Sequence, residues 1–418
     1  MIFELLMLRL HLWSAYKCPM LRYGLNKWAV SVTAALALFS VPSPYARSAD
    51  PPGSKGLTYV ILRFLRCPAK LYLNRETQAS QLRPPVGGQV PPTGRPDIPV
   101  AKSVAKSDTS TSIVIKVNGP QIQRGKTEIE THDDIVYSTP STAGNKPVEL
   151  KMDILVPNTG GMKPLVVWFP GGGFIYANKR GSLDHRTYVA EAGYVVASVQ
   201  YRTITNGATC KDGVADAKSA IRYLRAYADQ YSIDPGKIAV WGESAGGYIA
   251  AMVGTTNGVK QFDVGDNLDQ SSDVQAVIDQ FGPSDLSRIG ADFDPAYQRV
   301  LLSLGNSTAQ WVYGPGTKKS VSDDPRAIAR ANPATYVDSS DPPFLLFHGT
   351  ADKLVSPSQT LLVHNALRAK RVDSTRYVLI GAGHGDMSFM GDAMAGYAWS
   401  TQKVMGIIVT FLGKHIKS

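Results

Sequence analysis

The junction at residues 237–253 limits the fold of this chain more than any other stretch. It reads KIAVWGESAGGYIAAMV: an apolar run, Ile238–Trp241, stops at a glycine, and a second apolar run follows two further glycines. Ser244 lies between them, with Gly242 and Gly246 two residues away on either side. This spacing is typical of a sharp turn between a strand and a helix, in which the serine projects from the carboxyl end of the strand. Two interpretations follow: a tight structural turn, or a turn that presents Ser244 as a nucleophile.

Strands and helices alternate on either side of this junction. Three β-rich runs come first, at 112–117, 127–137 and 148–156. The expected strands that follow are PLVVWF, GYVVASV, KIAVW, VQAVIDQF, PFLLFHG and TRYVLI. The expected helices are VADAKSAIRYLRAYADQY, the segment after Ser244, SPSQTLLVHNALRAK and MAGYAWSTQKVMGIIVTFLGKH. Continuous apolar strands alternating with helices predict an α/β fold, with a mostly parallel sheet covered by helices on both faces.

A serine is a weak nucleophile at neutral pH unless a base and an orienting acid accompany it. Asp352 follows the apolar run PFLLFHG, and His384 follows YVLI in a glycine-rich loop. Both residues therefore come at carboxyl ends of predicted strands, the edge at which open α/β sheets bind their ligands. The order serine, acid, histidine is the one found when the serine occupies a strand-to-helix turn. We therefore predict that Ser244, Asp352 and His384 form a catalytic triad.

Other histidines and carboxylates compete for these roles. His348 lies at a strand end and is expected to be packed, and His364 lies inside a helix. His185 comes near the loop after Phe174 and is a weaker candidate base. The acids considered and set aside are Asp338 and Asp341, which precede their strand, Asp373 at a helix end, and Asp386, interpreted as a loop or pocket carboxylate.

A second glycine-rich loop supplies candidate hydrogen-bond donors. The strand VVWF leads through Pro170 into three glycines. Glycine lets a backbone approach a substrate closely with its N–H groups exposed. The amides of Gly172, Gly173 and Ala245 are therefore predicted to form an oxyanion hole, the alternative being a flexible turn.

Together these motifs resemble the α/β-hydrolase superfamily, and within it the carboxylesterases related to hormone-sensitive lipase and to bacterial feruloyl esterases. The resemblance covers about residues 125–415, through FPGGGF, DAKSAIRYLR, DPGKIAVWGESAGGYIAA, FGPSDL, PPFLLFHGTADKLVSPSQ and GAGHG. It implies an α/β-hydrolase fold with Ser244 as nucleophile, Asp352 as acid and His384 as base. Such esterases usually carry histidine before the triple glycine, whereas this chain has Pro170. The departure leaves the details of that loop open, because proline braces a backbone only through its fixed φ.

The long segment 286–340 has few clear periodic elements. We expect it to form a small cap over the site, inserted before the strand that leads to Asp352. Four residues are candidates for a substrate pocket: Phe174, Asp285, Trp311 and Tyr313. Tyr297, Trp311 and Tyr313 fit a core position inside the cap equally well.

The charge distribution argues against nucleic acid as a partner. The formal charge is +10, but residues 1–107 hold 14 Lys/Arg and 4 Asp/Glu, whereas residues 108–418 hold 30 of each. The body therefore has no net basic field. The three cysteines, Cys18, Cys67 and Cys210, form no CxxC pair, and only one bridge, Cys67–Cys210, is open to them after processing. No metal or cofactor is expected.

The amino-terminal part resembles an export signal followed by a linker. Arg22 and Lys27 precede fourteen uncharged residues, Trp28–Val41, and small residues flank a cut before Ala49. We expect residues 1–49 to be a signal region, with 1–19 a gene-model extension if Met20 is the true start. Residues 50–111 are predicted to be a disordered Pro/Gly-rich linker, and 112–418 the folded domain. The apolar, basic stretch LTYVILRFL inside the linker suggests transient contact with a membrane surface.

The resemblance and the triad together predict a secreted or periplasmic serine carboxylesterase that acts on a small-molecule ester through an acyl-enzyme. An uncleaved signal would instead anchor the chain in the inner membrane. The alternatives are a serine peptidase of the prolyl-oligopeptidase type and a catalytically inactive α/β-hydrolase used for binding.

Overall fold

The computed structural model describes residues 99–418, except for 117, 143, 386–395 and 418. Within these ranges no helix is long and apolar enough to cross a membrane. The predicted signal, the first part of the predicted linker, the stretch LTYVILRFL, Cys18, Cys67 and Asp386 lie outside the described residues. Cys210, the one cysteine among the described residues, is a free thiol.

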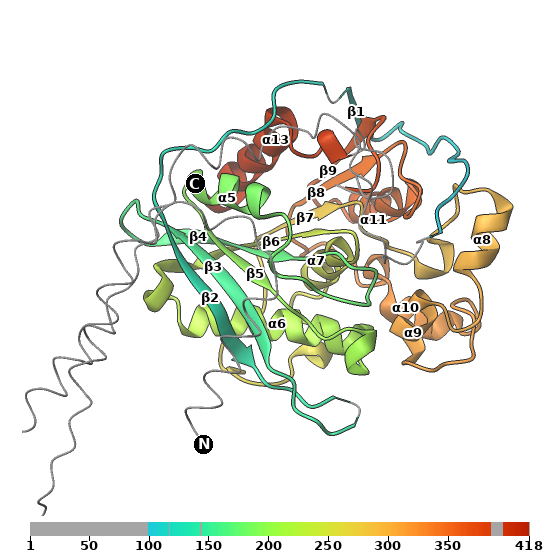
Figure 1. Ribbon diagram of the computed structural model, residues 1–418, viewed down its shortest axis with the longest axis horizontal. Coiled ribbons are helices and arrows are strands. Elements are labelled where there is room, and N and C mark those ends of the chain that lie inside the picture. The colour runs from blue at the N-terminus through green and yellow to red at the C-terminus, as the bar shows by residue number, and fades with distance from the viewer. Residues whose placement is uncertain (1–98, 117, 143, 386–395, 418) are drawn as a thin grey trace, which may run out of the picture. The chain divides into compact units, whose positions relative to one another are not determined.

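A nine-stranded sheet runs through the molecule in the order β1-β9-β8-β7-β6-β4-β5-β3-β2 (Figure 1). Every pairing from β1 to β5 is parallel, and β3 and β2 add antiparallel strands at one edge. The strands are β1 (Ile113–Lys116), β2 (Ile129–Ser138), β3 (Leu150–Pro157), β4 (Lys163–Phe169), β5 (Val195–Val199), β6 (Ile233–Glu243), β7 (Ala276–Gln280), β8 (Phe344–Gly349) and β9 (Ser374–Ile380). The predicted mostly parallel α/β sheet is confirmed.

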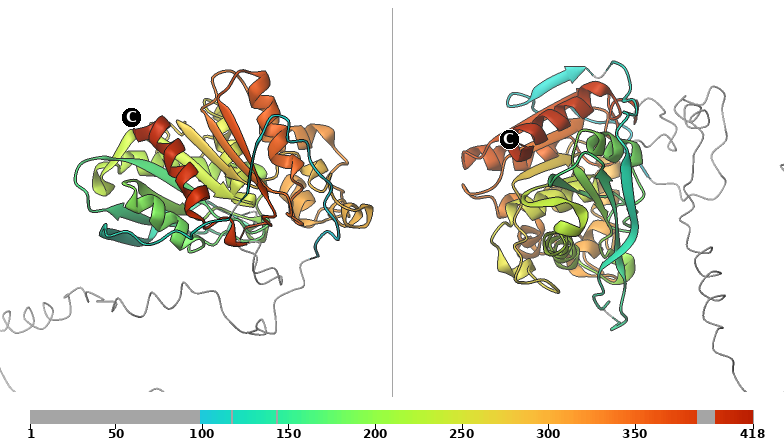
Figure 2. Two further views of the ribbon diagram at one scale, coloured as in Figure 1. Left: turned by 90° about the horizontal axis from the view of Figure 1, so that it is seen from above. Right: turned by 90° about the vertical axis from the view of Figure 1, so that its left-hand side faces the viewer.

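Helices cover both faces of the sheet, also as predicted (Figure 1, Figure 2). One face packs against α6 (Cys210–Ala226), α7 (Ala245–Thr255) and α11 (Ser358–Ala369), and the other against α5 (Leu183–Glu191) and α13 (Gln402–Leu412). The sequence of β4 is continuously apolar because both faces of this strand are buried. Leu165, Val167 and Phe169 belong to one core and Val166 and Trp168 to the other, because successive side chains of a strand point to opposite faces.

Three short helices lie between β7 and β8: α8 (Pro295–Leu301), α9 (Ser307–Tyr313) and α10 (Pro325–Ala331). Each begins at a side chain that accepts a hydrogen bond from its first turn, namely Asp294, Asn306 and Asp324. With seven residues each, they are too short to show a helical period in the sequence. They gather at the right of Figure 1, beside α11.

The segment 99–105, which we call the amino-terminal strap, corrects the predicted linker. The Ala101 amide donates to the Lys353 carbonyl (3.0 Å), next to the predicted acid Asp352. The Ala105 amide donates to the Asp292 carbonyl (2.7 Å), just before α8. The strap therefore joins the segment that precedes α8 to the loop that follows β8.

Side-chain burial holds the strap in place as well. Ala101 is 1% exposed and packs in a cluster with Phe293 and Tyr297. The Tyr297 hydroxyl donates to the Pro99 carbonyl (2.7 Å). Residues 99–105 therefore differ from the disordered linker that the composition predicts, because long-range contacts hold them on the folded domain.

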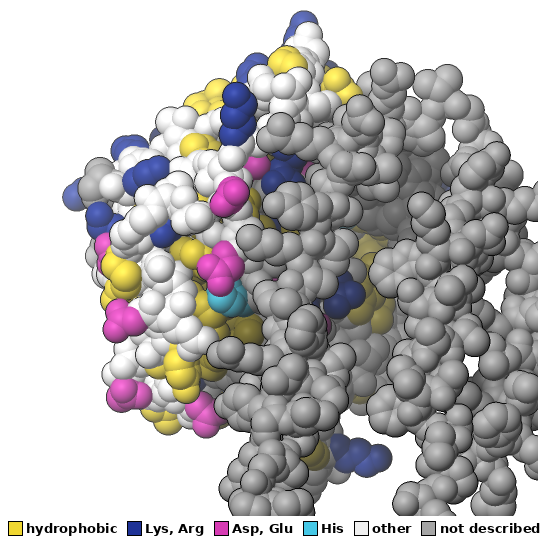
Figure 3. Space-filling model, turned by 60° about the vertical axis from the view of Figure 1, so that its left-hand side comes forward, with side chains coloured by type: hydrophobic (Ala, Val, Ile, Leu, Met, Phe, Trp, Pro, Cys, Tyr) yellow, Lys and Arg dark blue, Asp and Glu magenta, His cyan; other side chains and the backbone are white. Residues whose placement is uncertain are grey.

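Charged side chains of both signs are interspersed on the part of the surface drawn in colour in Figure 3. This distribution agrees with the equal numbers of acidic and basic residues from 108 to 418.

Candidate active site

The backbone at Ser244 is held in a strained conformation, with φ 56° and ψ −122°. A β-carbon added to Gly246 would collide with the Phe169 carbonyl, so this position has room only for glycine. The Ser244 amide donates to the Gln280 carbonyl (2.9 Å), which ties the turn to the neighbouring strand β7. The serine thus lies at the carboxyl edge of the sheet, at the start of α7, in a geometry typical of a nucleophile elbow.

The structure brings the three predicted triad residues together. The Nε2 atom of His384 lies 2.7 Å from the Ser244 Oγ, and its Nδ1 atom lies 2.7 Å from the Asp352 Oδ2. Since a carboxylate only accepts, Nδ1 carries the proton and Nε2 is free to accept the hydrogen of the serine hydroxyl. This tautomer is the one that a general base requires.

Asp352 is fully buried, yet it favours the charged form. Burial by itself raises the pKa of a carboxyl group, but His384 and His348 facing Asp352 outweigh it and hold the pKa of Asp352 well below its usual range. The Asp352 Oδ1 also accepts the amides of Leu354 (2.9 Å) and Val355 (3.0 Å). The carboxylate is therefore ready to orient an imidazole and to face a positive charge on it.

The glycine-rich loop after β4 abuts the elbow. A β-carbon on Gly171 would lie 2.9 Å from the Glu243 carbonyl oxygen and 3.1 Å from the Ser244 Cβ. Gly172 and Gly173 both have positive φ, at 144° and 59°. Among the residues that the structure describes, none accepts a hydrogen bond from the Gly172 or Gly173 amide.

Ala245 completes the predicted set of donors. It is the first residue of α7, where backbone N–H groups have no partner within the helix. Its amide adjoins Ser244 at the positive end of the helix dipole. The three predicted donors thus come from two segments that meet at the serine.

The loop is held by contacts that compensate for the proline before it. Tyr201 is a buried residue that follows β5 in the chain, and its hydroxyl donates to the Pro170 carbonyl (2.8 Å). The Thr203 hydroxyl donates to the Ile175 carbonyl (2.8 Å). The fixed φ of proline is therefore not the only brace: the connection from β5 to α6 binds the loop on both sides of its glycines.

Two predicted pocket residues are part of the core. Trp311 is 0% exposed and stacks on Phe174, with ring centroids 4.8 Å apart and ring planes 10° apart. Phe174 is 3% exposed. Both side chains belong to the core cluster, and their part in a substrate pocket stays a prediction. Their stacking fixes α9 against the glycine-rich loop.

The other aromatic and acidic candidates also make structural contacts. The Tyr313 hydroxyl donates to the Val321 carbonyl (2.9 Å) and accepts the Asp324 amide (3.0 Å). Asp285 accepts the amide (3.1 Å) and the hydroxyl (2.6 Å) of Ser287 at the start of a 3₁₀ turn. Tyr297 packs under the amino-terminal strap. These contacts support the core alternative for Tyr297 and Tyr313.

The competing histidines have other partners. The His185 Nε2 lies 2.9 Å from the Ser400 Oγ, and its Nδ1 lies 3.5 Å from the Glu243 carboxylate. His364 lies within α11, away from the triad residues, with its Nδ1 2.8 Å from the Ser374 Oγ. His348 is packed, as expected, but it also contacts Asp352, which the sequence did not indicate.

Sequence reasoning missed the ring that supports the base. Phe281 directly follows β7 with a positive φ of 47°, and its ring centroid lies 4.8 Å from that of His384. Trp399 packs on its edge at 4.6 Å and donates its indole N–H to the Gly383 carbonyl (3.2 Å). No local pattern marks these residues, because each contact joins segments far apart in the chain.

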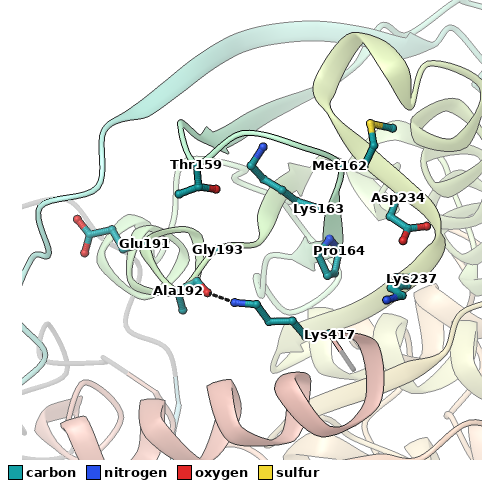
Figure 4. A pocket seen from close by; sticks show the side chains of 10 residues that line it. All are labelled: Thr159, Met162, Lys163, Pro164, Glu191, Ala192, Gly193, Asp234, Lys237 and Lys417. Carbon is teal, nitrogen blue, oxygen red and sulfur yellow. Dashed lines mark hydrogen bonds between the residues drawn. The ribbon is translucent and has the colours of Figure 1, made fainter.

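A separate surface pocket of about 410 Å³ lies away from these residues (Figure 4). Its lining includes Lys163, Glu191, Asp234 and Lys417, and the Lys417 ammonium donates to the Ala192 carbonyl (2.7 Å). Within the described ranges, no group of three or more His, Cys, Asp or Glu side chains is arranged to hold a metal ion.

Curated proteins with similar sequences are esterases by name. The chain is 26% identical over 230 residues to a probable carboxylic ester hydrolase, LipM, of Mycobacterium tuberculosis, covering 54% of this chain and 50% of LipM. It is 28% identical over 226 residues to esterase LipC of the same organism, covering 53% of each chain. The chain thus spans about half the length of the curated relatives it matches.

Solved structures show the same fold. A truncated carbohydrate esterase from gut microbiota matches with a TM-score of 0.59 at 24% identity, over 72% of this chain and 100% of that one. A thermophilic esterase of the planctomycete Thermogutta terrifontis, Est2, matches with a TM-score of 0.51 at 26% identity, over 69% of this chain and 92% of that one. The fold is therefore that of the α/β-hydrolases.

The family model BD-FAE matches residues 152–367, more than half of the chain. The matched range runs from β3 to α11 and includes Ser244 and Asp352, whereas His384 follows it. On its sequence and its fold, this chain belongs to the BD-FAE family of α/β-hydrolases.

Proposed function

We propose that this chain is a serine carboxylic-ester hydrolase. The observation that carries the proposal is the hydrogen-bonded series from Ser244 through His384 to Asp352, with 2.7 Å at each imidazole nitrogen. The series ends at a strained turn beside the Gly172 and Gly173 amides, which have no acceptor among the described residues, a setting in which a serine attacks an acyl carbon. The names of the curated relatives support the same reaction class.

In the proposed reaction, the Ser244 Oγ attacks the ester carbonyl carbon and its proton passes to the His384 Nε2. The negative charge on the carbonyl oxygen is held by the amides of Ala245 and of the two glycines, Gly172 and Gly173. The tetrahedral intermediate then breaks its bond to the alcohol oxygen, which takes the proton from His384. Water, activated by the same imidazole, hydrolyses the acyl-enzyme and restores the serine.

The names of the curated relatives have only the ester bond in common. One group is named for carboxylic esters in general, and another is named isoprenylcysteine alpha-carbonyl methylesterase. A panel of esters graded by acyl length and by aromatic character of the alcohol would define the preference of this chain.

Replacing the nucleophile tests the proposal. Ser244→Ala should keep the fold and lose ester hydrolysis by about 10⁴-fold or more. Ser219→Ala is the control, since Ser219 is buried on α6 and its hydroxyl has no hydrogen-bond partner among the described residues. A folded Ser244→Ala chain that keeps more than about a tenth of the activity contradicts the proposed nucleophile.

We also propose that the chain is exported, to the cell exterior or the periplasm, or is held at the inner membrane by an uncleaved signal. The proposal rests on the basic residues and the apolar run that precede Ala49. Cell fractionation with mass analysis of the mature amino terminus distinguishes these sites, and an intact chain in the cytoplasm contradicts all three.

A further inference from the structure

The Asp352 carboxylate has a second imidazole neighbour that the proposed reaction does not use. His348, the penultimate residue of β8, is 0% exposed. Its Nε2 lies 3.2 Å from the Asp352 Oδ2, the same oxygen that lies 2.7 Å from the His384 Nδ1. With the two backbone amides on Oδ1, the buried carboxylate faces four donors. Two of them are imidazoles that share one oxygen.

The partners of His348 assign its protons. Its Nε2 faces the Asp352 carboxylate and the Val355 carbonyl (3.0 Å), neither of which can donate, so Nε2 carries a hydrogen. Its Nδ1 lies 3.1 Å from the Thr360 Oγ1, which accepts the Nε–H of Arg376 (2.9 Å). The Thr360 hydroxyl keeps its own hydrogen while it accepts from Arg376, so it is able to donate to Nδ1. This arrangement fits a His348 tautomer with its hydrogen on Nε2, which bonds the Val355 carbonyl and lies 3.2 Å from the Asp352 carboxylate.

Arg376, which donates to Thr360, is itself held by two further hydrogen bonds. Arg376, on β9, is 1% exposed, and its Nη2 donates to the Pro357 carbonyl (2.7 Å) just before α11. Its Nη1 donates to the Ser112 hydroxyl (2.8 Å) just before β1. Hydrogen bonds therefore run from β9 through α11 to His348 on β8, and a 3.2 Å contact joins the His348 Nε2 to the carboxylate beside His384.

We propose that His348 is a positioning residue for the ester hydrolysis proposed above: its Nε2–H fixes the Asp352 oxygen that orients His384 and keeps that carboxylate ionised while His384 takes the serine proton. The inference rests on the proposed function of the triad. A donor to the ionised form of a buried carboxyl opposes the effect of burial, which favours the neutral form. A neutral Asp352 would no longer hold the His384 proton on Nδ1. The titratable groups that face Asp352 are His348, His384 and, farther away, Tyr297 on α8.

Three substitutions of His348 separate positioning from packing. Leucine removes the donor and fills the space. Glutamine keeps a donor, because its Nε2 is as many bonds from Cα as that of histidine. The amide nitrogen of asparagine is only as many bonds from Cα as the Nδ1 of histidine, which faces Thr360. Asparagine therefore loses the contact with Asp352. His364→Leu is the matched control: His364 is 1% exposed and bonded to Ser374 and Thr111.

The expected result is a loss in kcat with little change in KM. In His348→Leu and His348→Asn, kcat on a nitrophenyl ester should fall by about 10- to 100-fold, the cost of a misplaced catalytic group. The acidic midpoint of kcat/KM should move to lower pH, because a carboxyl group that loses its donor ionises less readily and stabilises protonated His384 less. His348→Gln should stay within about fivefold of the unmodified chain, and His364→Leu should lower only the melting temperature.

Two outcomes would overturn the proposal. One is a folded His348→Leu or His348→Asn chain with kcat within about twofold of the unmodified chain and an unmoved pH midpoint. The other is an equal loss in His348→Gln and His348→Asn, since a purely structural role does not distinguish a donor at one reach from a donor at another. If the leucine variant fails to fold, the comparison of glutamine with asparagine decides.

Proton NMR gives a readout that needs no turnover. The downfield resonance of the His384 Nδ1–H, identified by its loss in His384→Gln, should shift in His348→Leu and His348→Asn. It should stay in place in His348→Gln and His364→Leu. An unmoved resonance in His348→Leu refutes the positioning role. An unmodified chain that shows the resonance but hydrolyses no ester contradicts the proposed function. In that case the shift of the resonance between the His348 variants still tests the positioning role of His348.

Discussion

Replacing Asp279 by asparagine should make the protein more stable at neutral and alkaline pH. Asp279 lies on β7, is 0% exposed, and accepts one amide, that of Gly282 (2.8 Å). Its other oxygen has no hydrogen-bond partner among the described residues. Burial raises the pKa of Asp279 to about 7, against the lowering effect of the Gly282 amide. Asparagine keeps an oxygen for that amide and never ionises.

The size of the effect follows from the difference between the folded and unfolded pKa. An unfolded Asp titrates near 3.9, so the difference is about 3 units, and at about 1.36 kcal/mol per unit the total is about 4 kcal/mol. The sign is destabilising: between about pH 4 and pH 7 the folded state binds more protons than the unfolded state, so the free energy of unfolding falls as pH rises. Above about pH 7 the full amount is lost, and Asp279→Asn should recover most of it.

Urea unfolding at about pH 5 and pH 8 measures this difference. Asp269→Asn is the control, because Asp269 is an exposed carboxylate on the loop before β7. The free energy of unfolding of Asp279→Asn should exceed that of the unmodified chain by about 1.5 kcal/mol at pH 5 and by about 4 kcal/mol at pH 8, a rise of about 2 to 3 kcal/mol. A difference that is the same at both pH values would refute the reasoning that Asp279 is neutral in the folded protein at low pH and ionises at a cost.

Three further predictions concern the segments around the site. A chain that starts at residue 108 should melt at least about 5 °C below one that starts at 99, because it lacks the amino-terminal strap and uncovers Tyr297; equal melting temperatures would show that the strap adds no stability. Tyr201→Phe leaves the Pro170 carbonyl without its buried donor, at about 1 to 3 kcal/mol, and should lower kcat more than it raises KM; a change confined to KM would contradict its role as a brace. Trp311→Ala should cost about 3 to 5 kcal/mol of unfolding free energy in urea, since it empties the space beside Phe174, whereas a pocket residue would change ester preference with little loss of stability.

The sheet and the three triad residues could be predicted because their signals are local. β4 and β6 carry continuous apolar runs, and the turn at Ser244 carries its glycines within five residues. Asp352 and His384 each follow a strand of a parallel sheet, so topology alone brings them to the same edge as the serine.

The remaining features depend on contacts between distant segments. Trp311 is an aromatic residue in the segment that was expected to cap the site, so the sequence made it a pocket candidate. Its stacking on Phe174 shows that it belongs to the core. The strap at 99–105 continues a Pro/Gly-rich stretch, yet it is ordered by residues nearly 200 positions later. His348 was correctly expected to be packed, but its contact with Asp352 depends on how the loop after β8 turns back.

The most direct test of the proposed reaction is to trap the acyl-enzyme. The chain is mixed with a nitrophenyl ester, quenched in acid within milliseconds, and digested for mass spectrometry. We expect a burst of about one nitrophenolate per chain and an acyl group on the peptide that contains Ser244, neither of which forms in Ser244→Ala. An ester that is hydrolysed without an acyl adduct, or an adduct on another residue that persists in Ser244→Ala, would contradict Ser244 as the nucleophile.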